Sequence, residues 1–75
     1  MKTVSVVVAC YNEEGNVAAL HEKLCEVFKE KLPEYNYQIL FMDNDSTDNT
    51  RAIIKDLCKK DPDHVAAIFN VHNFG

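Results

Sequence analysis

The order of hydrophobic patterns along the chain limits the possible fold more than any other feature. Residues 4–10 (VSVVVAC) are β-branched and almost continuously apolar, which is typical of a strand buried on both faces of a parallel sheet. From Gly15 onward, apolar residues recur at steps of three and four, and Pro33 ends this helical pattern. A second strand pattern (37–42), a second helical pattern that stops near Asp61, and a third strand pattern (65–71) follow. This alternation predicts an α/β fold with two right-handed crossovers and a parallel β-α-β-α-β sheet.

The two predicted helices are amphipathic. Charged residues separate their apolar positions, so each helix should lay one apolar stripe on the sheet. The stripe of the first helix consists of Val17, Leu20, Leu24, Val27, Phe28 and Leu32, and that of the second consists of Ile53, Ile54, Leu57 and Cys58.

Length and composition exclude several classes of protein. At 75 residues the chain is at most one small domain, or a piece of a longer protein. Its formal charge is −4 and its eight basic residues are scattered, so we expect no nucleic-acid partner. Three cysteines at wide spacings indicate reduced thiols. No apolar run is long enough to cross a bilayer, so we expect this part to be soluble and cytoplasmic.

Two polar clusters follow the first two predicted strands. They are residues 10–14 (CYNEE) and residues 43–50 (DNDSTDNT). Ligands of open parallel sheets bind beyond the carboxyl ends of the strands, so both clusters lie where a binding site is expected.

Capping is the simplest explanation of part of these clusters. Ser46 or Thr47 could cap the second helix, with Asp48 favoured in its first turn by the helix dipole, and Asn12 could cap the first helix. Capping does not explain Asp43, which comes before these candidate caps.

Two metal-binding motifs are only partly matched by the sequence. A calcium loop starting at Asp43 would need glycine at Asp48 and glutamate at Ile54. The segment 21–25 (HEKLC) resembles a helical zinc-protease motif, but Cys25 replaces its second histidine. We therefore interpret His21 as a histidine on the helix surface.

A phosphatase is an alternative interpretation of the second cluster. Residues 43–47 (DNDST) have the D-x-D-x-T form of haloacid-dehalogenase-like phosphatases, in which Asp43 would be the nucleophile and Asp45 the acid/base. In that family the motif normally follows the first strand, whereas here it follows the second.

Taken together, the two clusters resemble another family more closely. VSVVVACYNEEGNVAAL, followed by a strand ending in MDNDSTDNT, resembles the start of family 2 glycosyltransferases of the GT-A fold, a Rossmann-like fold. The usual patterns there are V-x-P-x-Y-N-E-E-x-N and D-D-G-S-x-D-x-T. Ala9 replaces the proline of the first pattern, and Asn44-Asp45 replaces Asp-Gly of the second. The closing Asn73-Phe74-Gly75 is similar to the branch that uses polyprenyl-phosphate or dolichyl-phosphate acceptors, although His72 stands where a basic residue often precedes it.

The resemblance implies a nucleotide-sugar donor, either a UDP-sugar or a GDP-sugar. Asp43 would accept an N–H of the base, Tyr11 would lie against the base, and Glu13 would approach the ribose hydroxyls. The remaining residues of this predicted pocket are Ala9, Cys10, Phe41 and Asn44. A non-catalytic nucleotide-binding module with the same pocket is a third possibility.

The resemblance also places the catalytic groups elsewhere. A Mg²⁺ or Mn²⁺ ion would be held by an Asp-x-Asp motif after a fourth strand, and the base for the acceptor would come later still. Residues 1–75 are therefore expected to be an incomplete N-terminal nucleotide-binding portion, with no catalytic residue and no metal ligand. The family's strand order leaves residues 4–10 at an open sheet edge, so a homo-oligomer through that edge and membrane association through other parts are further expectations.

Overall fold

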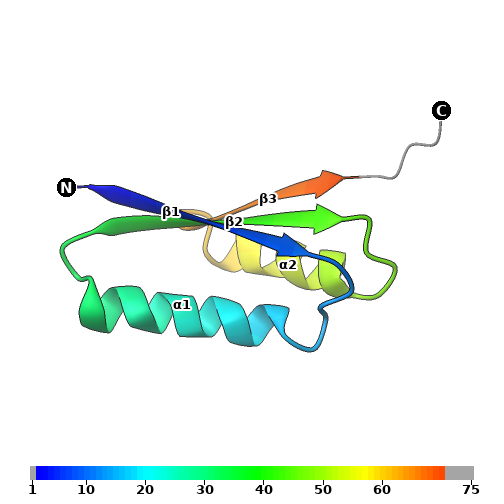
Figure 1. Cartoon of the computed structure of the whole chain (residues 1–75), viewed down its shortest axis with the longest axis horizontal. Helices are drawn as coiled ribbons and strands as arrows, with labels where there is room; N and C mark the ends of the chain where they lie inside the picture. The colour runs from blue at the N-terminus through cyan, green and yellow to red at the C-terminus, as the bar shows by residue number, and fades with distance from the viewer. Residues whose placement is uncertain (1, 71–75) are drawn as a thin grey trace.

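The computed structural model describes residues 2–70, which form a three-stranded parallel sheet and two helices (Figure 1). Strand β1 covers Thr3–Cys10, β2 covers Asn36–Asn44 and β3 covers Val65–Asn70. Helix α1 covers Val17–Lys31 and α2 covers Thr50–Lys60. The predicted element order is confirmed, while Val71 and the segment 72–75 lie outside the described residues.

The strand order is β1-β2-β3, and both pairs are parallel. Cys10 is level with Asp43, and Asp43 is level with Phe69, so the carboxyl ends of the strands meet at one end of the sheet. The loops that lead into α1 and α2 both start there (Figure 1). The polar clusters predicted to form a site are therefore neighbours in space.

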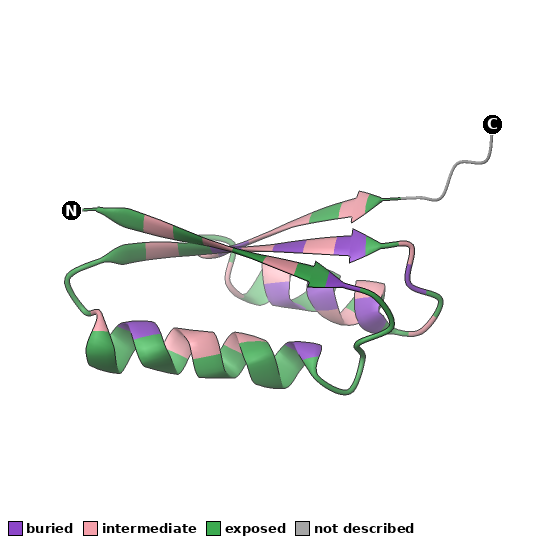
Figure 2. Ribbon diagram, viewed as in Figure 1, coloured by how far each residue is buried: buried purple, intermediate pink, exposed green. Residues whose placement is uncertain are grey.

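The core lies between the sheet and the two helices, which cover the same face of the sheet (Figure 1). Ile39 and Phe41 of the central strand are fully buried, and Ile54 and Leu57 of α2 pack in the same cluster. Figure 2 shows buried positions on the sides of the helices that face the sheet. Alternate residues of β2 point to the helices because side chains of a strand alternate between its faces.

The other face of the sheet is apolar and uncovered, which corrects the prediction that residues 4–10 are buried on both faces. Val7 of β1 is 58% exposed and Ile68 of β3 is 45% exposed. Val7 is level with Leu40, and Met42 is level with Ile68, so these side chains form cross-strand rows on the open face. An apolar strand sequence indicates that both faces can be buried, but it does not say what covers them. Here both helices pack on one face, so the second face is exposed to solvent.

Helix α1 buries less of its apolar stripe than the sequence predicts. Val17 and Phe28 are buried, whereas Leu20 and Val27 are more than a third exposed. The reason is that α1 lies at the margin of a narrow sheet. Only the midline of its apolar stripe, along the length of the helix, faces the core, and residues on one side of that midline are exposed. Within residues 2–70, neither helix is both long and apolar enough to span a membrane.

Candidate functional site

Hydrogen bonds tie together the two loops at the carboxyl end of the sheet. The backbone N–H of Asn12 donates to Ser46 Oγ at 2.9 Å, and the N–H of Glu13 donates to Thr50 Oγ1 at 2.8 Å. In return, the N–H of Thr47 donates to Asn12 Oδ1 at 2.8 Å. Each loop thus satisfies polar groups of the other, and the pair forms one polar surface at the strand ends.

Asp43, the second-last residue of β2, is completely buried, with 0% exposure. Its carboxylate accepts the N–H of Ser46 at 3.1 Å and also the Ser46 hydroxyl. Arg51 Nε lies 3.6 Å from Asp43 Oδ2 and has no hydrogen-bond partner among residues 2–70. A buried carboxylate requires such partners, because an uncompensated charge away from water is costly. Asp43 therefore holds the loop in shape.

The caps of the helices differ from those predicted. The residue at the N-cap position of α2 is Asn49, without a side-chain cap, and Ser46 and Thr47 make the bonds described above. Asp48 supplies the acceptor that a cap would give, because its Oδ1 accepts the N–H of Thr50 at 2.9 Å. Asn12 does not cap α1, whose N-cap position is Asn16. The prediction failed because several neighbouring residues had equal capping chemistry.

Hydrogen bonding also alters the acidity of Asp48. Partial desolvation acts to raise its pKa, but bonds from Thr50 and Glu14 outweigh it, so the pKa of Asp48 is below its usual value of 3.8. The Glu14 bond is the N–H of Glu14 to Asp48 Oδ2 at 3.3 Å. An ionised Asp48 therefore joins the start of α2 to the loop before α1.

Two residues at the strand ends have left-handed backbone conformations. Asn12 has φ 50° and Asp45 has φ 57°. Asparagine and aspartate tolerate this region better than most residues, and glycine tolerates it best. Asp45 stands where the D-D-G-S pattern has glycine, so its backbone conformation gives a physical reason for that glycine.

The structure brings some of the predicted pocket residues together and separates others. A cavity of about 220 Å³ beside the end of β1 is lined by Ala9, Cys10 and Glu13, with Val8, Asn16, Val17 and Leu20. Tyr11 follows in the chain and is 57% exposed. Phe41 is fully buried in the core, and Asn44 is exposed and accepts Nδ2–H of Asn70 at 3.1 Å.

Sequence reasoning missed one residue of this region, Arg51, which faces Asp43. Thr50, the last residue of the second polar cluster, is fully buried and bridges Glu13 and Asp48. The guanidinium of Arg51 also lies 5.0 Å from the centre of the Phe69 ring. The available signal was a basic residue at the start of a helix that follows an acidic strand end, which favours an ion pair across the intervening loop.

The thiol at the end of β1 is held in its neutral form. Burial raises the pKa of Cys10, and the negative charges of Asp43 and Glu13 raise it further. Its sulfur points back to the carbonyl of Val8 at 3.8 Å. Cys10 therefore forms an uncharged part of the cavity wall.

Two acidic side chains of residues 43–50 are engaged in hydrogen bonds within the fold. Asp43 and Asp48 already accept hydrogen bonds, and the group of potential metal ligands in the described part of the chain lies elsewhere, at His21, Cys25 and Asp61. Asp43 is buried under Ser46 and Arg51, so a ligand of either kind, a phosphate or a base, could reach its carboxylate only if Ser46 moved.

Comparison with known proteins identifies the sequence pattern. The family described as "Glycosyl transferase family 2" matches residues 5–75. The undecaprenyl-phosphate 4-deoxy-4-formamido-L-arabinose transferase of Proteus mirabilis is 32% identical over 72 residues, which cover 96% of this chain and 22% of that protein. No solved structure matches the chain.

The names of two further relatives mention a lipid. The dolichyl N-acetyl-alpha-D-glucosaminyl phosphate 3-beta-D-2,3-diacetamido-2,3-dideoxy-beta-D-glucuronosyltransferase of Methanococcus voltae is 37% identical over 60 residues, covering 80% of this chain and 18% of that protein. The beta-monoglucosyldiacylglycerol synthase of a Nostoc strain is 37% identical over 57 residues, covering 76% of this chain and 12% of that protein. The chain spans between 12% and 22% of the length of these three relatives.

Proposed function

Because the chain belongs to glycosyl transferase family 2, we propose that it forms part of the donor pocket of an enzyme that transfers a sugar from a nucleoside diphosphate. The observation that carries this proposal is the cavity at the end of β1, lined by Ala9, Cys10 and Glu13. These three residues belong to the pocket that the sequence predicts, and they meet at the carboxyl end of a parallel sheet, where nucleotides bind in such folds.

In the proposed complex, Tyr11 and Glu13 contact the nucleoside. Tyr11 has 57% of its surface free, and stacking of a base on an aromatic ring contributes about 1–3 kcal/mol. Glu13 is exposed, and its N–H and C=O are held by Thr50 and by the N–H groups of Asn16 and Val17. Its carboxylate accepts Nδ2–H of Asn16 at 3.1 Å through Oε2, so Oε1 is the oxygen that we propose for the ribose hydroxyls. A fixed backbone with an oriented carboxylate suits recognition of a hydroxyl group.

The proposed contact between Asp43 and the base needs a local rearrangement. Its carboxylate is 0% exposed and bonded to Ser46, so a base N–H could reach it only if the Ser46 hydroxyl turned away. Such an exchange replaces one hydrogen bond by another. We propose that Asp43 shapes the loop in the free protein and accepts the base when the donor binds.

The proposed acceptor is a lipid, with a polyprenyl phosphate favoured. The names of two relatives contain undecaprenyl phosphate and a dolichyl phosphate derivative. The resemblance to the family implies that the ligands of the divalent ion and the base for the acceptor lie outside these 75 residues, and we propose the same for this protein. We therefore expect the 75 residues alone to transfer no sugar.

Titration with UDP and GDP, followed by amide chemical shifts, tests the proposed pocket. Shifts should gather at residues 9–14 and 43–50. Asp43→Asn should weaken nucleotide binding by about 1.5–3 kcal/mol, the range for a hydrogen bond to a charged group. Asp63→Asn, a change of an exposed aspartate before β3, is the matched control.

Ser46→Ala separates the two roles of Asp43. If the base replaces the Ser46 hydroxyl, this variant frees the carboxylate and binds nucleotide at least as tightly as the parent chain. The Ser46 hydroxyl also accepts the Asn12 N–H, so the amide shifts of residues 11–13 in the free variant are the control. Weaker binding by Ser46→Ala with these shifts unchanged would mean that Asp43 acts only by holding the loop. Absence of saturable shifts with either nucleotide would contradict the donor pocket itself.

A further inference from the structure

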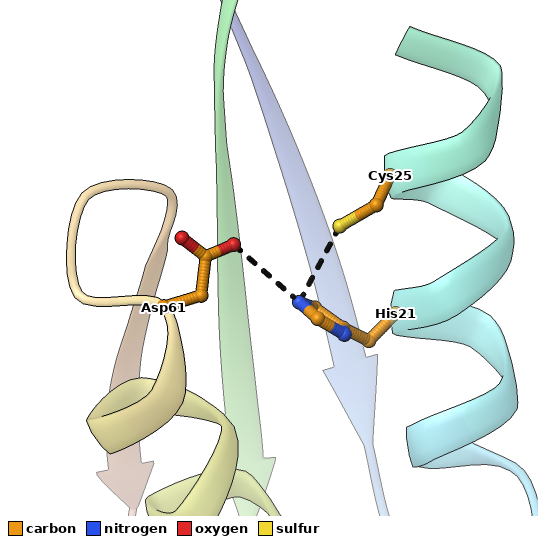
Figure 3. A group of neighbouring side chains, drawn as sticks. All are labelled: His21, Cys25 and Asp61. Carbon is orange, nitrogen blue, oxygen red and sulfur yellow. Dashed lines mark hydrogen bonds and ion pairs between the residues drawn. The ribbon is translucent and has the colours of Figure 1, made fainter. Parts of the chain in front are cut away.

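Three potential metal ligands meet on the side of the fold away from the nucleotide loops. His21 and Cys25 are one turn apart on α1, and Asp61 is the C-cap residue of α2 (Figure 3). His21 Nε2 lies 3.5 Å from Cys25 Sγ and 3.7 Å from Asp61 Oδ2. All three ligand atoms are within 4.8 Å of one another, and all three residues are half-buried.

Two of the three separations are close to those of a tetrahedral zinc site. Bonds of about 2.0–2.1 Å to nitrogen and oxygen and about 2.3 Å to sulfur, at tetrahedral angles, separate the ligand atoms by roughly 3.3–3.6 Å. The two measured separations, 3.5 and 3.7 Å, agree with this range to within a small movement of the side chains. Both involve the same nitrogen, so one atom of His21 is correctly placed with respect to both partners.

The kinds of ligand also favour zinc over the ions expected for sugar transfer. A thiolate and an imidazole suit Zn²⁺, whereas Mg²⁺ and Ca²⁺ take oxygen ligands. One thiolate and one carboxylate would neutralise both charges of the ion, which suits a half-buried position. Residues 2–70 thus contain a ligand set that differs in chemistry from an Asp-x-Asp motif.

A contact from outside the three ligands already orients one of them, Asp61. His64 Nδ1 lies 2.9 Å from Asp61 Oδ1, which leaves Oδ2 directed to His21. His64 in turn stacks on Tyr37 with ring centres 4.1 Å apart. Such outer contacts are usual around zinc ligands.

A fourth coordination position would face solvent. A groove of about 560 Å³ between α1 and α2 is lined by both His21 and Cys25, and Glu22 also borders it. We propose that His21 Nε2, Cys25 Sγ and Asp61 Oδ2 bind Zn²⁺, with water from this groove as the fourth ligand. The ion would join the middle of α1 to the end of α2.

The proposed site changes how residues 21–25 are understood. His21 is not the surface histidine that the sequence suggested, because its side chain is only 17% exposed and faces α2. Cys25, which disqualified a zinc-protease motif, is itself a suitable zinc ligand. The third ligand, 36 positions after Cys25, comes from another element, so a local motif could not reveal it.

Cobalt substitution tests the site directly. Co²⁺ added to the 75-residue chain, with a phosphine reductant, should give a thiolate charge-transfer band and the visible bands of tetrahedral cobalt, and Zn²⁺ should displace them. Cys25→Ser should remove the charge-transfer band and weaken zinc binding more than about 100-fold, since even outer contacts are worth about 10–100-fold. Cys58→Ser, which changes another half-buried thiol, should leave both unchanged.

Two more variants keep the test decisive if Cys25→Ser folds poorly. Cys25→His should lose the charge-transfer band but keep zinc affinity within about 10-fold, because histidine is also a zinc ligand. His64→Ala should weaken zinc binding about 10–100-fold. An octahedral cobalt spectrum without a thiolate band, or equal affinity in His21→Gln and the parent chain, would overturn the proposal. Neither result bears on nucleotide binding.

Discussion

Removing the carboxylate of Asp43 should destabilise the fold, independently of any effect on ligand. Asp43→Ala deletes the acceptor of the Ser46 N–H and hydroxyl, both of which are buried with it. Each bond to a charged group contributes about 1.5 kcal/mol or more, which gives about 3 kcal/mol for the two. Arg51 adds less than about 1 kcal/mol, because it is a third exposed and 3.6 Å away.

The expected loss of about 3–4 kcal/mol is large for this chain. A 75-residue domain has a free energy of unfolding of roughly 4–11 kcal/mol at typical values per residue. Urea unfolding followed by far-ultraviolet circular dichroism should therefore show a much lower midpoint for Asp43→Ala. Asp43→Asn should lose about half as much, because its amide oxygen can still accept one Ser46 bond.

Asp63→Ala is the control for Asp43→Ala. Asp63 is exposed in the turn before β3, and surface substitutions usually change stability by less than about 0.5 kcal/mol. If Asp43→Ala lost no more than this control, the bonds to Ser46 would not stabilise the loop, and the structural role given to Asp43 would be wrong.

Three further predictions concern the loops and the sheet. Asp45→Gly should stabilise the chain by up to about 1 kcal/mol in thermal melts, because φ 57° suits glycine better than aspartate; a lower melting temperature would contradict this. Because the pKa of Asp48 is lowered in the folded state, ionised Asp48 stabilises the fold above pH 3.8, and this stabilisation is lost as the pH falls through the folded-state pKa. Asp48→Asn should therefore flatten the acid-induced loss of unfolding free energy in that range. An unchanged pH profile would refute this prediction. The chain should self-associate at micromolar concentrations through β1, which is an edge strand with Val7 58% exposed. In ultracentrifugation, Val7→Lys should shift the chain to monomer, and a monomeric parent chain would refute this prediction.

The sequence predicted the fold well because its signals were local. The change from continuous apolar runs to helical spacing located all five elements, and Pro33 and Asp61 lie just beyond the ends of α1 and α2. What the pattern could not predict was which faces would be covered. Val7 is as apolar as its neighbours, and only the placement of both helices on one side leaves it exposed.

The site was predictable in place but not in detail. Both polar clusters do lie at the carboxyl ends of β1 and β2, as parallel strands require. The partners within the clusters depend on residues 34 to 37 positions apart, such as Asn12 with Ser46 and Glu13 with Thr50. No local rule distinguishes a serine that caps a helix from one that binds an aspartate on the preceding strand.

The bonds between the two loops also determine when this end of the sheet becomes ordered. The N–H groups of Asn12, Glu13 and Glu14 are held by side chains from the other loop, so they gain protection only after β1, α1 and β2 have assembled. Breaking one loop releases the other, so these amides should exchange with deuterium together, as one cooperative unit that opens before the core. A ligand bound at either loop would slow exchange at both, and the slowing at the loop without direct contact would measure how strongly the two are coupled.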